Sequence, residues 1–383
     1  MPESEAAVPL TGFRLMDGNE AAAWGALYAG CGFFAGYPIT PATGILNAML
    51  SILPSQGKTV LQTEDEIAAI GTCIGASMAG LKSMTATSGP GVSLYSEHVS
   101  FAVGSEIPLV IIDVQRLGPS TGSATKGADG DVQFMRWGNS GGQPVIVLCP
   151  TDVRDCLLLT VQAFNLAETY RCPVFLASNK EIGLTKESLD LSGLDWPPVM
   201  QRRMATGKGE FLPFHTEPGQ DVPAFAPLGD QSRLVRQTSS THGEDGYITA
   251  SRQEIAAQQE RRRRKVESHV QDMAFMEYFG DRQAETVIVT YGVSARSAVA
   301  AWRRLAGQGV SLGVLVLKTL WPVLENRIGE VCELAQRIVV AELNQGQYAR
   351  EIQRILPDKQ IRGLGRMDGD LIAPQQIEEV VHG

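Results

Sequence analysis

Short apolar segments alternate with helical segments along the first half of the chain, and this alternation limits the fold more than any other feature. Residues 108–114 (PLVIIDV) are apolar except for Asp113, which is typical of a strand buried on both faces of a parallel sheet. Further short strand candidates, separated by stretches of helical character, occur at residues 32–37, 144–148 and 173–178, and a Thr-rich one occurs at residues 83–87. Strands that alternate with helices predict an open parallel α/β sheet with helices on both of its faces.

The length of the chain favours more than one domain, because 383 residues exceed what a single compact core usually serves. We expect a first α/β domain over residues 1–190, a connecting arm with a basic helix over residues 191–270, and a second α/β domain over residues 271–383. The arm is rich in Pro, Gly and acidic residues, and its length suggests that it wraps a partner subunit. Its consecutive cations, Arg261 to Lys265, form either a solvated or acid-paired helix face or a docking site for an anionic ligand or partner.

Composition excludes several classes of protein. The formal net charge of −9 argues against a nucleic-acid surface, and no apolar run approaches the ~20 residues that would span a membrane. The first residues (MPESEAAVPLTG) lack the basic and apolar regions of a signal peptide, so we expect a cytoplasmic protein. The six cysteines are scattered without a C-x-x-C pair, which indicates buried, reduced thiols rather than ligands of an iron–sulfur cluster.

Several common catalytic motifs do not occur in the sequence. It contains no P-loop, no G-x-G-x-x-G before a helix, no H-E-x-x-H and no G-x-S-x-G elbow. What remains is a set of loops that follow predicted strands, at residues 37–41, 87–91 and from 115 onward. In an open parallel sheet such loops lie along one edge, where ligands bind. They hold several hydroxyl groups and one arginine.

Glu66 lies near the start of a predicted helix. Thr63 followed three residues later by Glu66 fits a capping box, and an apolar run at residues 67–70 comes next. Gly71 and Gly75 recur at helical spacing, so one face of this helix is small enough for another backbone to approach closely. The spacing by itself is compatible both with a glutamate that only caps the helix and with a carboxylate that belongs to a site.

Taken together, these loops resemble those of a known family. The resemblance rests on GYPITP (36–41), TEDEIAAIGTCIGASMAG (63–80), TATSGPG (85–91), QRLGPSTGSATKGADGD (115–131) and LKTLWP (317–322). In this order they are similar to the alpha subunit of the 2-oxoacid:ferredoxin oxidoreductases, and YPITP and R-x-G-P-S-T-G are closest to the 2-oxoglutarate branch. The resemblance covers nearly the whole chain. It implies a pyrimidine-type thiamine diphosphate-binding domain followed by a smaller transketolase C-terminal-like α/β domain.

The resemblance also implies which residues touch the cofactor. Glu66 matches the glutamate that forms a hydrogen bond with N1′ of the aminopyrimidine ring. This bond favours the imino tautomer, whose nitrogen removes the C2 proton of the thiazolium ring. Tyr37, Pro38, Ile39 and Gly89 are expected to lie in the same cofactor-binding pocket.

A second group of residues is implied to bind the substrate. Thr40 and Arg116 match residues that approach the 2-oxoacid carboxylate, for which a planar guanidinium group is well suited. The alternative for Arg116 is an ion pair that stabilises its loop. Thr121 and Lys126 lie in the same loop, and Lys126 is either a ligand of the distal carboxylate of a dicarboxylic substrate or a solvated surface lysine.

The resemblance finally implies a reaction and its partners. Thiamine diphosphate would be shared with a beta subunit that carries the Mg²⁺ and the [4Fe-4S] cluster, in a dimer of alpha–beta heterodimers. The reaction would be the reversible oxidative decarboxylation of 2-oxoglutarate to succinyl-CoA and CO2, with coenzyme A as co-substrate and ferredoxin as electron acceptor. Two alternatives remain: the same chemistry on pyruvate or a branched-chain 2-oxoacid, and a non-catalytic scaffold subunit of this fold.

Overall fold

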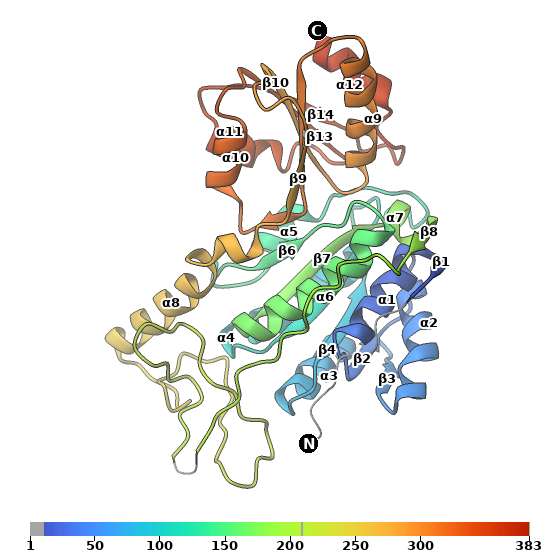
Figure 1. Cartoon of the computed structure of the whole chain (residues 1–383). Helices are drawn as coiled ribbons and strands as arrows, with labels where there is room; N and C mark the ends of the chain where they lie inside the picture. Colours follow the sequence, from blue (N-terminus) through green and yellow to red (C-terminus); the bar gives the residue numbers. More distant parts are fainter. Residues whose placement is uncertain (1–10, 208–209, 383) are drawn as a thin grey trace.

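The computed structural model describes residues 11–207 and 210–382, which form two α/β units connected by an arm (Figure 1). The acidic segment before residue 11 lies outside the described residues. The first unit is built on a seven-stranded sheet of order β12-β6-β7-β5-β4-β2-β3. Its strands are β2 (Phe33–Gly36), β3 (Thr59–Gln62), β4 (Ser83–Thr87), β5 (Leu109–Gln115), β6 (Ile146–Leu148), β7 (Pro173–Asn179) and β12 (Thr319–Trp321).

Helices cover both faces of this sheet, which confirms the predicted architecture. One face carries α1 (Gly18–Tyr28), α2 (Thr43–Ile52) and α6 (Val153–Tyr170), and the other carries α3 (Glu66–Met78), α4 (Gly89–Gly104) and α5 (Val132–Trp137). The central strand β5 is buried on both sides, since Val110 and Ile112 belong to the first core layer and Leu109 and Ile111 to the second. All neighbours in the sheet are parallel except β12, which pairs antiparallel with β6.

The strand β12 was not expected from the sequence. Thr319–Trp321 adds an edge strand to the first sheet although it follows the strands β10 and β11 of the second unit. Trp321 also donates its indole N–H to the carbonyl oxygen of Val132 at 3.1 Å. The two units therefore share a sheet and a continuous apolar core.

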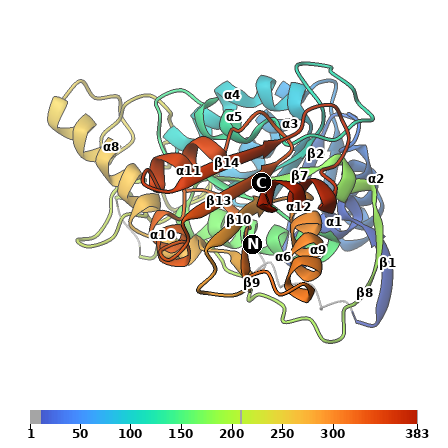
Figure 2. The same cartoon turned by 90° about the horizontal axis from the view of Figure 1, so that it is seen from above.

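The second unit is a smaller sheet with helices on both sides (Figure 2). Its strand order is β14-β13-β10-β11-β9, and only β9 runs antiparallel. The strands are β9 (Met276–Gly280), β10 (Thr286–Tyr291), β11 (Leu312–Leu317), β13 (Arg337–Glu342) and β14 (Gln360–Gly365). Its helices are α9 (Ser294–Gly307), α10 (Glu325–Val331), α11 (Ala349–Ile355) and α12 (Pro374–His382).

Shorter elements complete the fold. A two-stranded antiparallel ribbon joins β1 (Phe13–Asp17) to β8 (Lys186–Asp190). The remaining short elements are the 3-10 turns η1 (Pro54–Gln56) and η2 (Val270–Met273) and the helix α7 (Lys180–Leu184). The arm beyond β8 has little regular structure until α8 (Arg252–Glu267).

The basic helix α8 is anchored by a buried carboxylate. Glu106 is fully buried, and it accepts hydrogen bonds from Arg261 Nη1 at 3.0 Å and from Lys265 Nζ at 2.7 Å. These cations hold the pKa of Glu106 well below its usual range, although burial alone would raise it. The acid-paired interpretation of Arg261 and Lys265 is therefore confirmed.

The cysteines agree with the sequence prediction of buried, reduced thiols. All six cysteines are free and buried, and burial raises the pKa of Cys31 to about 12 and of Cys172 to about 11. They are therefore protonated thiols at neutral pH. In the part of the chain that the structure describes, we find no helix long and apolar enough to cross a membrane.

Candidate active site

The loops singled out in the sequence meet at the carboxyl edge of the first sheet. The strands β2, β4 and β5 are parallel neighbours, so the residues that follow them lie side by side. Residues 37–41 follow β2, residues 88–91 follow β4, and Arg116 begins the loop between β5 and α5, residues 116–131, called the β5–α5 loop below. The predicted position of these loops is confirmed.

Glu66 is the first residue of α3, and its side chain does not cap the helix. The cap is Asp65, whose Oδ1 accepts the N–H of Ala68 at 2.7 Å. The predicted capping box from Thr63 is therefore wrong, and the Thr63 hydroxyl donates instead to the carbonyl oxygen of Asp65 at 2.9 Å. Glu66 is only 7% exposed, and within the described residues no donor bonds to its carboxylate. The carboxylate oxygens are not among the fully buried unpaired atoms, so a ligand at this edge can donate a hydrogen bond to them.

The turn from β4 into α4 packs directly against Glu66. A Cβ atom at Gly91 would stand 1.9 Å from Thr87 Oγ1 and 2.8 Å from Glu66 Cγ, so only glycine fits there. The hydroxyl oxygens of Thr87 and Ser88 are buried and have no hydrogen-bond partner among the described residues. The sequence reasoning named neither Thr87 nor Gly91 as a site residue, although both lie in TATSGPG.

Arg116 is brought to Thr40, but through the backbone. Its Nη1 donates to the carbonyl oxygen of Thr40 at 2.6 Å, while the Thr40 side chain is exposed. Arg116 is 6% exposed, and its Nε is buried without a partner among the described residues. In that part of the chain Arg116 forms no ion pair, so the alternative of a loop-stabilising ion pair is not seen. The guanidinium group keeps donors that an anionic ligand can use.

Two buried aspartates lie beside Arg116. Asp113, in β5, and Asp131, at the end of the β5–α5 loop, place their carboxyl groups against one another. Burial raises the pKa of Asp113 well above its usual range, and burial also raises that of Asp131 to about 6, although the Arg116 charge opposes this. The nearby Asp131 charge adds to the effect of burial in raising the pKa of Asp113. This contact between different elements was not foreseen from the sequence.

The remaining predicted residues lie around this group. Tyr37 is 38% exposed, and Ile39 packs against the core beneath α1 and α2. Gly89 opens α4, and a Cβ atom there would lie 3.1 Å from Asp131 Oδ2. Pro38 is half-buried between Tyr37 and Ile39.

Thr121 and Lys126 lie further out along the β5–α5 loop. Thr121 is exposed. Lys126 Nζ stands 3.4 Å from Asp370 Oδ1 of the second unit, with half of each side chain or more exposed. The structure thus brings Glu66, Thr87, Gly91, Thr40 and Arg116 to one edge and leaves Thr121 and Lys126 at the surface.

The residues at this edge fit the aminopyrimidine half of a thiamine cofactor. Such a ring needs an acceptor for a protonated N1′, an apolar wall and further polar partners. Glu66 offers an acceptor without a donor among the described residues, and Thr87 and Ser88 offer unpaired hydroxyl groups. In the described part of the chain no cluster of three or more His, Cys, Asp or Glu side chains could hold a metal ion.

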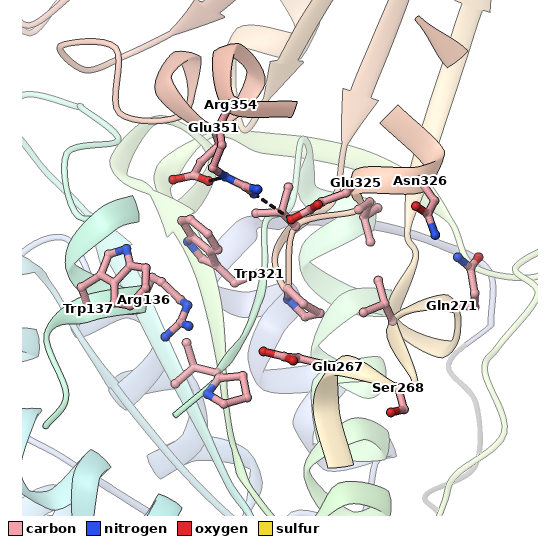
Figure 3. A pocket seen from close by; sticks show the side chains of 16 residues that line it. Arg136, Trp137, Glu267, Ser268, Gln271, Trp321, Glu325, Asn326, Glu351 and Arg354 are labelled. Carbon is pink, nitrogen blue, oxygen red and sulfur yellow. Dashed lines mark hydrogen bonds and ion pairs between the residues drawn. The ribbon is translucent and has the colours of Figure 1, made fainter. Parts of the chain in front are cut away.

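A large cavity lies away from this edge. It measures about 710 Å³ and is formed by α5, the end of α8 and the second unit (Figure 3). Its charged groups largely neutralise one another, since Arg354 pairs with Glu325 at 2.8 Å and with Glu351 at 3.0 Å. None of the residues predicted to bind cofactor or substrate lines it. Size alone therefore does not mark the site in this chain.

Comparison with protein families defines the class of protein. The model of the thiamine diphosphate-binding domain of pyruvate flavodoxin/ferredoxin oxidoreductases matches residues 24–262. The model of pyruvate:ferredoxin oxidoreductase core domain II matches residues 284–377. Both describe parts of thiamine-dependent oxidoreductases, so an enzyme of this class is indicated.

The chain belongs to the 2-oxoacid:ferredoxin oxidoreductase family. The 2-oxoglutarate synthase subunit KorA of Methanothermobacter marburgensis is 39% identical over 96% of this chain and 98% of its own length. The ketoisovalerate oxidoreductase subunit VorB of Methanothermobacter thermautotrophicus is 31% identical over 96% of this chain and 97% of its own length. The predicted resemblance to the 2-oxoglutarate branch is confirmed.

A solved structure supports the same placement. The 2-oxoglutarate:ferredoxin oxidoreductase from Magnetococcus marinus, solved with 2-oxoglutarate, coenzyme A and succinyl-CoA bound, is 31% identical and superimposes with a TM-score of 0.91. The match covers 97% of this chain and 65% of that one. The chain thus spans about two thirds of the solved relative. The predicted pair of α/β domains, with the thiamine diphosphate-binding domain first, is confirmed.

Proposed function

We propose that this chain is the alpha subunit of a 2-oxoglutarate:ferredoxin oxidoreductase. The reaction is the reversible oxidative decarboxylation of 2-oxoglutarate to succinyl-CoA and CO2, with electrons passed to ferredoxin. The observation that carries the proposal is the buried Glu66 carboxylate, which lacks a donor among the described residues and lies at the sheet edge that also carries Arg116. The higher identity to 2-oxoglutarate synthase subunits than to a ketoisovalerate oxidoreductase subunit supports the choice of substrate.

In this proposal each residue of the edge has a simple task. Thiamine diphosphate, when bound, supplies the nucleophilic carbon for the keto group of the substrate. Glu66 accepts a hydrogen bond from N1′ and stabilises the proton there. Arg116 binds the carboxylate at C1, and its hydrogen bond to the Thr40 carbonyl holds the guanidinium group in place. Thr87 and Ser88 satisfy polar atoms of the ring.

A partner subunit is needed to complete the site. Four large apolar side chains on the elements around Glu66 are exposed, namely Tyr37 at 38%, Leu61 at 40%, Ile67 at 47% and Leu94 at 46%. Their exposure beside the site supports a surface that another chain covers. We assign this role to a beta subunit that holds the diphosphate, the Mg²⁺ and the [4Fe-4S] cluster, in a cytoplasmic dimer of alpha–beta heterodimers that reduces ferredoxin.

The change Glu66→Gln in the reconstituted complex tests the enzyme proposal against the scaffold alternative. Loss of an acid–base group costs ~10²–10⁴-fold in rate, so we expect kcat for decarboxylation to fall at least 100-fold. Glu64→Gln is the matched control, because Glu64 is exposed two residues earlier and should leave kcat unchanged. An unchanged rate in Glu66→Gln would leave only the scaffold alternative.

The substrate is tested separately. The wild-type complex should show a higher kcat/KM with 2-oxoglutarate than with pyruvate or 2-oxoisovalerate. Lys126→Ala should reduce only the value for 2-oxoglutarate if Lys126 leaves Asp370 to bind the distal carboxylate. A preference for either monocarboxylic substrate would overturn the assignment of 2-oxoglutarate, while the role of Glu66 would stand.

A further inference from the structure

The second unit forms hydrogen bonds with the last residues of the β5–α5 loop, residues 129–131, called the limb below. The N–H of Asp129 donates to the carbonyl oxygen of Leu343 at 2.9 Å, and Asn344 Nδ2 donates to the carbonyl oxygen of Asp129 at 2.9 Å. Gln347 Nε2 donates to the carbonyl oxygen of Gly130 at 2.6 Å. These residues belong to the segment 343–347, which follows β13. Figure 1 shows α5, just after the loop, directly below the second unit.

Gln347 continues this contact into α5. Its Oε1 accepts the N–H of Gln133 at 2.9 Å, and its carbonyl oxygen accepts a hydrogen bond from Gln133 Nε2 at 2.9 Å. Both polar atoms of the Gln347 side chain are therefore used on the backbone of the first unit. The Gln347 side chain therefore holds both the end of the loop, at Gly130, and the start of α5, at Gln133.

The segment 343–347 is itself rigid. Asn344 is 1% exposed, donates to Tyr291 Oη at 2.7 Å and accepts the N–H of Gln347 at 2.8 Å. Tyr291 in turn donates to Glu342 Oε2 at 2.7 Å, and the same oxygen accepts the N–H of Tyr348 at 3.0 Å. A buried network in which every member is paired holds one conformation.

The limb is linked back to Arg116. The N–H of Asp131 donates to Gln115 Oε1 at 3.0 Å, and Gln115 directly precedes Arg116. Arg116 then reaches the Thr40 carbonyl. Hydrogen bonds thus join Asn344 and Gln347 to residues 129 and 130, and Asp131 to Gln115, which is the neighbour of Arg116 in the chain.

We infer that Asn344 and Gln347 are positioning residues for 2-oxoacid binding, because they fix the β5–α5 loop in the conformation that presents Arg116. This inference rests on the proposed function. A loop that populates its competent conformation only in part lowers the apparent affinity by that fraction. Loss of the contact should therefore raise KM and leave kcat nearly unchanged, since the bound state keeps its geometry.

The test replaces Gln347 by Met, which keeps the length of the side chain and removes both hydrogen-bonding atoms. Gln347 is only half-buried, so the variant should fold. The matched control is Gln376→Met, since Gln376 Oε1 accepts the N–H of Ala373 at 2.9 Å and Arg366 Nη1 at 3.2 Å, both within the second unit. We expect KM for 2-oxoglutarate to rise about tenfold in Gln347→Met, as for a loop that is competent about one tenth of the time, and to stay at the wild-type value in the control.

A second measurement does not depend on turnover. Hydrogen exchange of the amides of residues 116–131 should become faster in Gln347→Met and remain unchanged in Gln376→Met. The inference is overturned if both variants match the wild type in KM and in hydrogen exchange. It is also overturned if the amides of the loop exchange faster in Gln347→Met while KM is unchanged. A joint fall of KM and kcat in both variants would overturn it as well. A wild-type complex that turns over no 2-oxoacid would refute the proposed function instead, and exchange alone would then decide whether Gln347 fixes the loop.

Discussion

Gly91→Ala offers the sharpest test of the geometry around Glu66. The added methyl group would stand 1.9 Å from Thr87 Oγ1, 2.8 Å from Glu66 Cγ and 3.1 Å from Glu66 Oε1. Both side chains are buried, so Thr87 and Glu66 must shift by roughly 1 Å to admit it. Such overpacking costs about 1–3 kcal/mol, partly offset by the ~1 kcal/mol that alanine gains over glycine in a helix. The net loss of stability should therefore be small.

The effect on catalysis should be much larger, because a displacement of about 1 Å in a positioned group can cost ~100-fold in rate. We expect kcat of the reconstituted complex to fall about 100-fold, measured as 2-oxoglutarate-dependent reduction of ferredoxin. Gly329→Ala in α10 is the matched control, since no described atom lies within 4 Å of its added methyl group, and it should keep wild-type activity. Wild-type turnover by Gly91→Ala would show that the position of Glu66 does not limit the reaction.

Two further predictions concern stability. Glu106→Gln leaves Arg261 and Lys265 buried without their counter-charge, so it should lower the free energy of unfolding by about 3–5 kcal/mol in urea denaturation. The control Glu260→Gln, on the exposed face of α8, should leave the free energy of unfolding unchanged. Equal stability of the two variants would show that the buried ion pairs do not anchor the helix. Burial raises the pKa of Asp129 from 3.8 to about 7. Between these pH values the folded chain therefore keeps a proton on Asp129 that the unfolded chain releases. The stability that this carboxyl group contributes is full below pH ~4 and is lost as the pH rises to about 7. Asp129→Asn should therefore gain melting temperature over the wild type between pH 5 and pH 8, and parallel curves for the two proteins would contradict the raised pKa.

Much of the fold could be predicted, because the strands of a parallel sheet carry their burial in their own sequence. The apolar run of β5 and its neighbours fixed the order of elements and placed the loops at one edge. The position of Glu66 in the first turn of α3 was also accessible. The capping residue of α3 could not be predicted, because Asp65 and Thr63 are both residue types that cap helices. Which of them caps depends on where the helix starts, and the N–H of Ala68 bonds to Asp65.

Features that depend on contacts between distant segments were not accessible. The meeting of Asp113 with Asp131 depends on the path of the β5–α5 loop, which the second unit sets through Gln347. Gly91 could be recognised as a glycine turn, but its contact with Glu66 requires the packing of α3 against α4. Local patterns report burial and turns, whereas these contacts arise only when the elements are packed.

The edge strand β12 has a consequence for how the chain unfolds and for whether its two halves are soluble apart. Since three residues of the C-terminal half complete the sheet of the N-terminal half, heating should melt both together, in one calorimetric peak with equal van't Hoff and calorimetric enthalpies. A chain divided near residue 271 would give an N-terminal fragment in which β6 is an unpaired edge strand. Such an edge is prone to pair with other extended peptides in the cell. Co-expression of the two pieces, rather than either alone, should then restore a soluble particle.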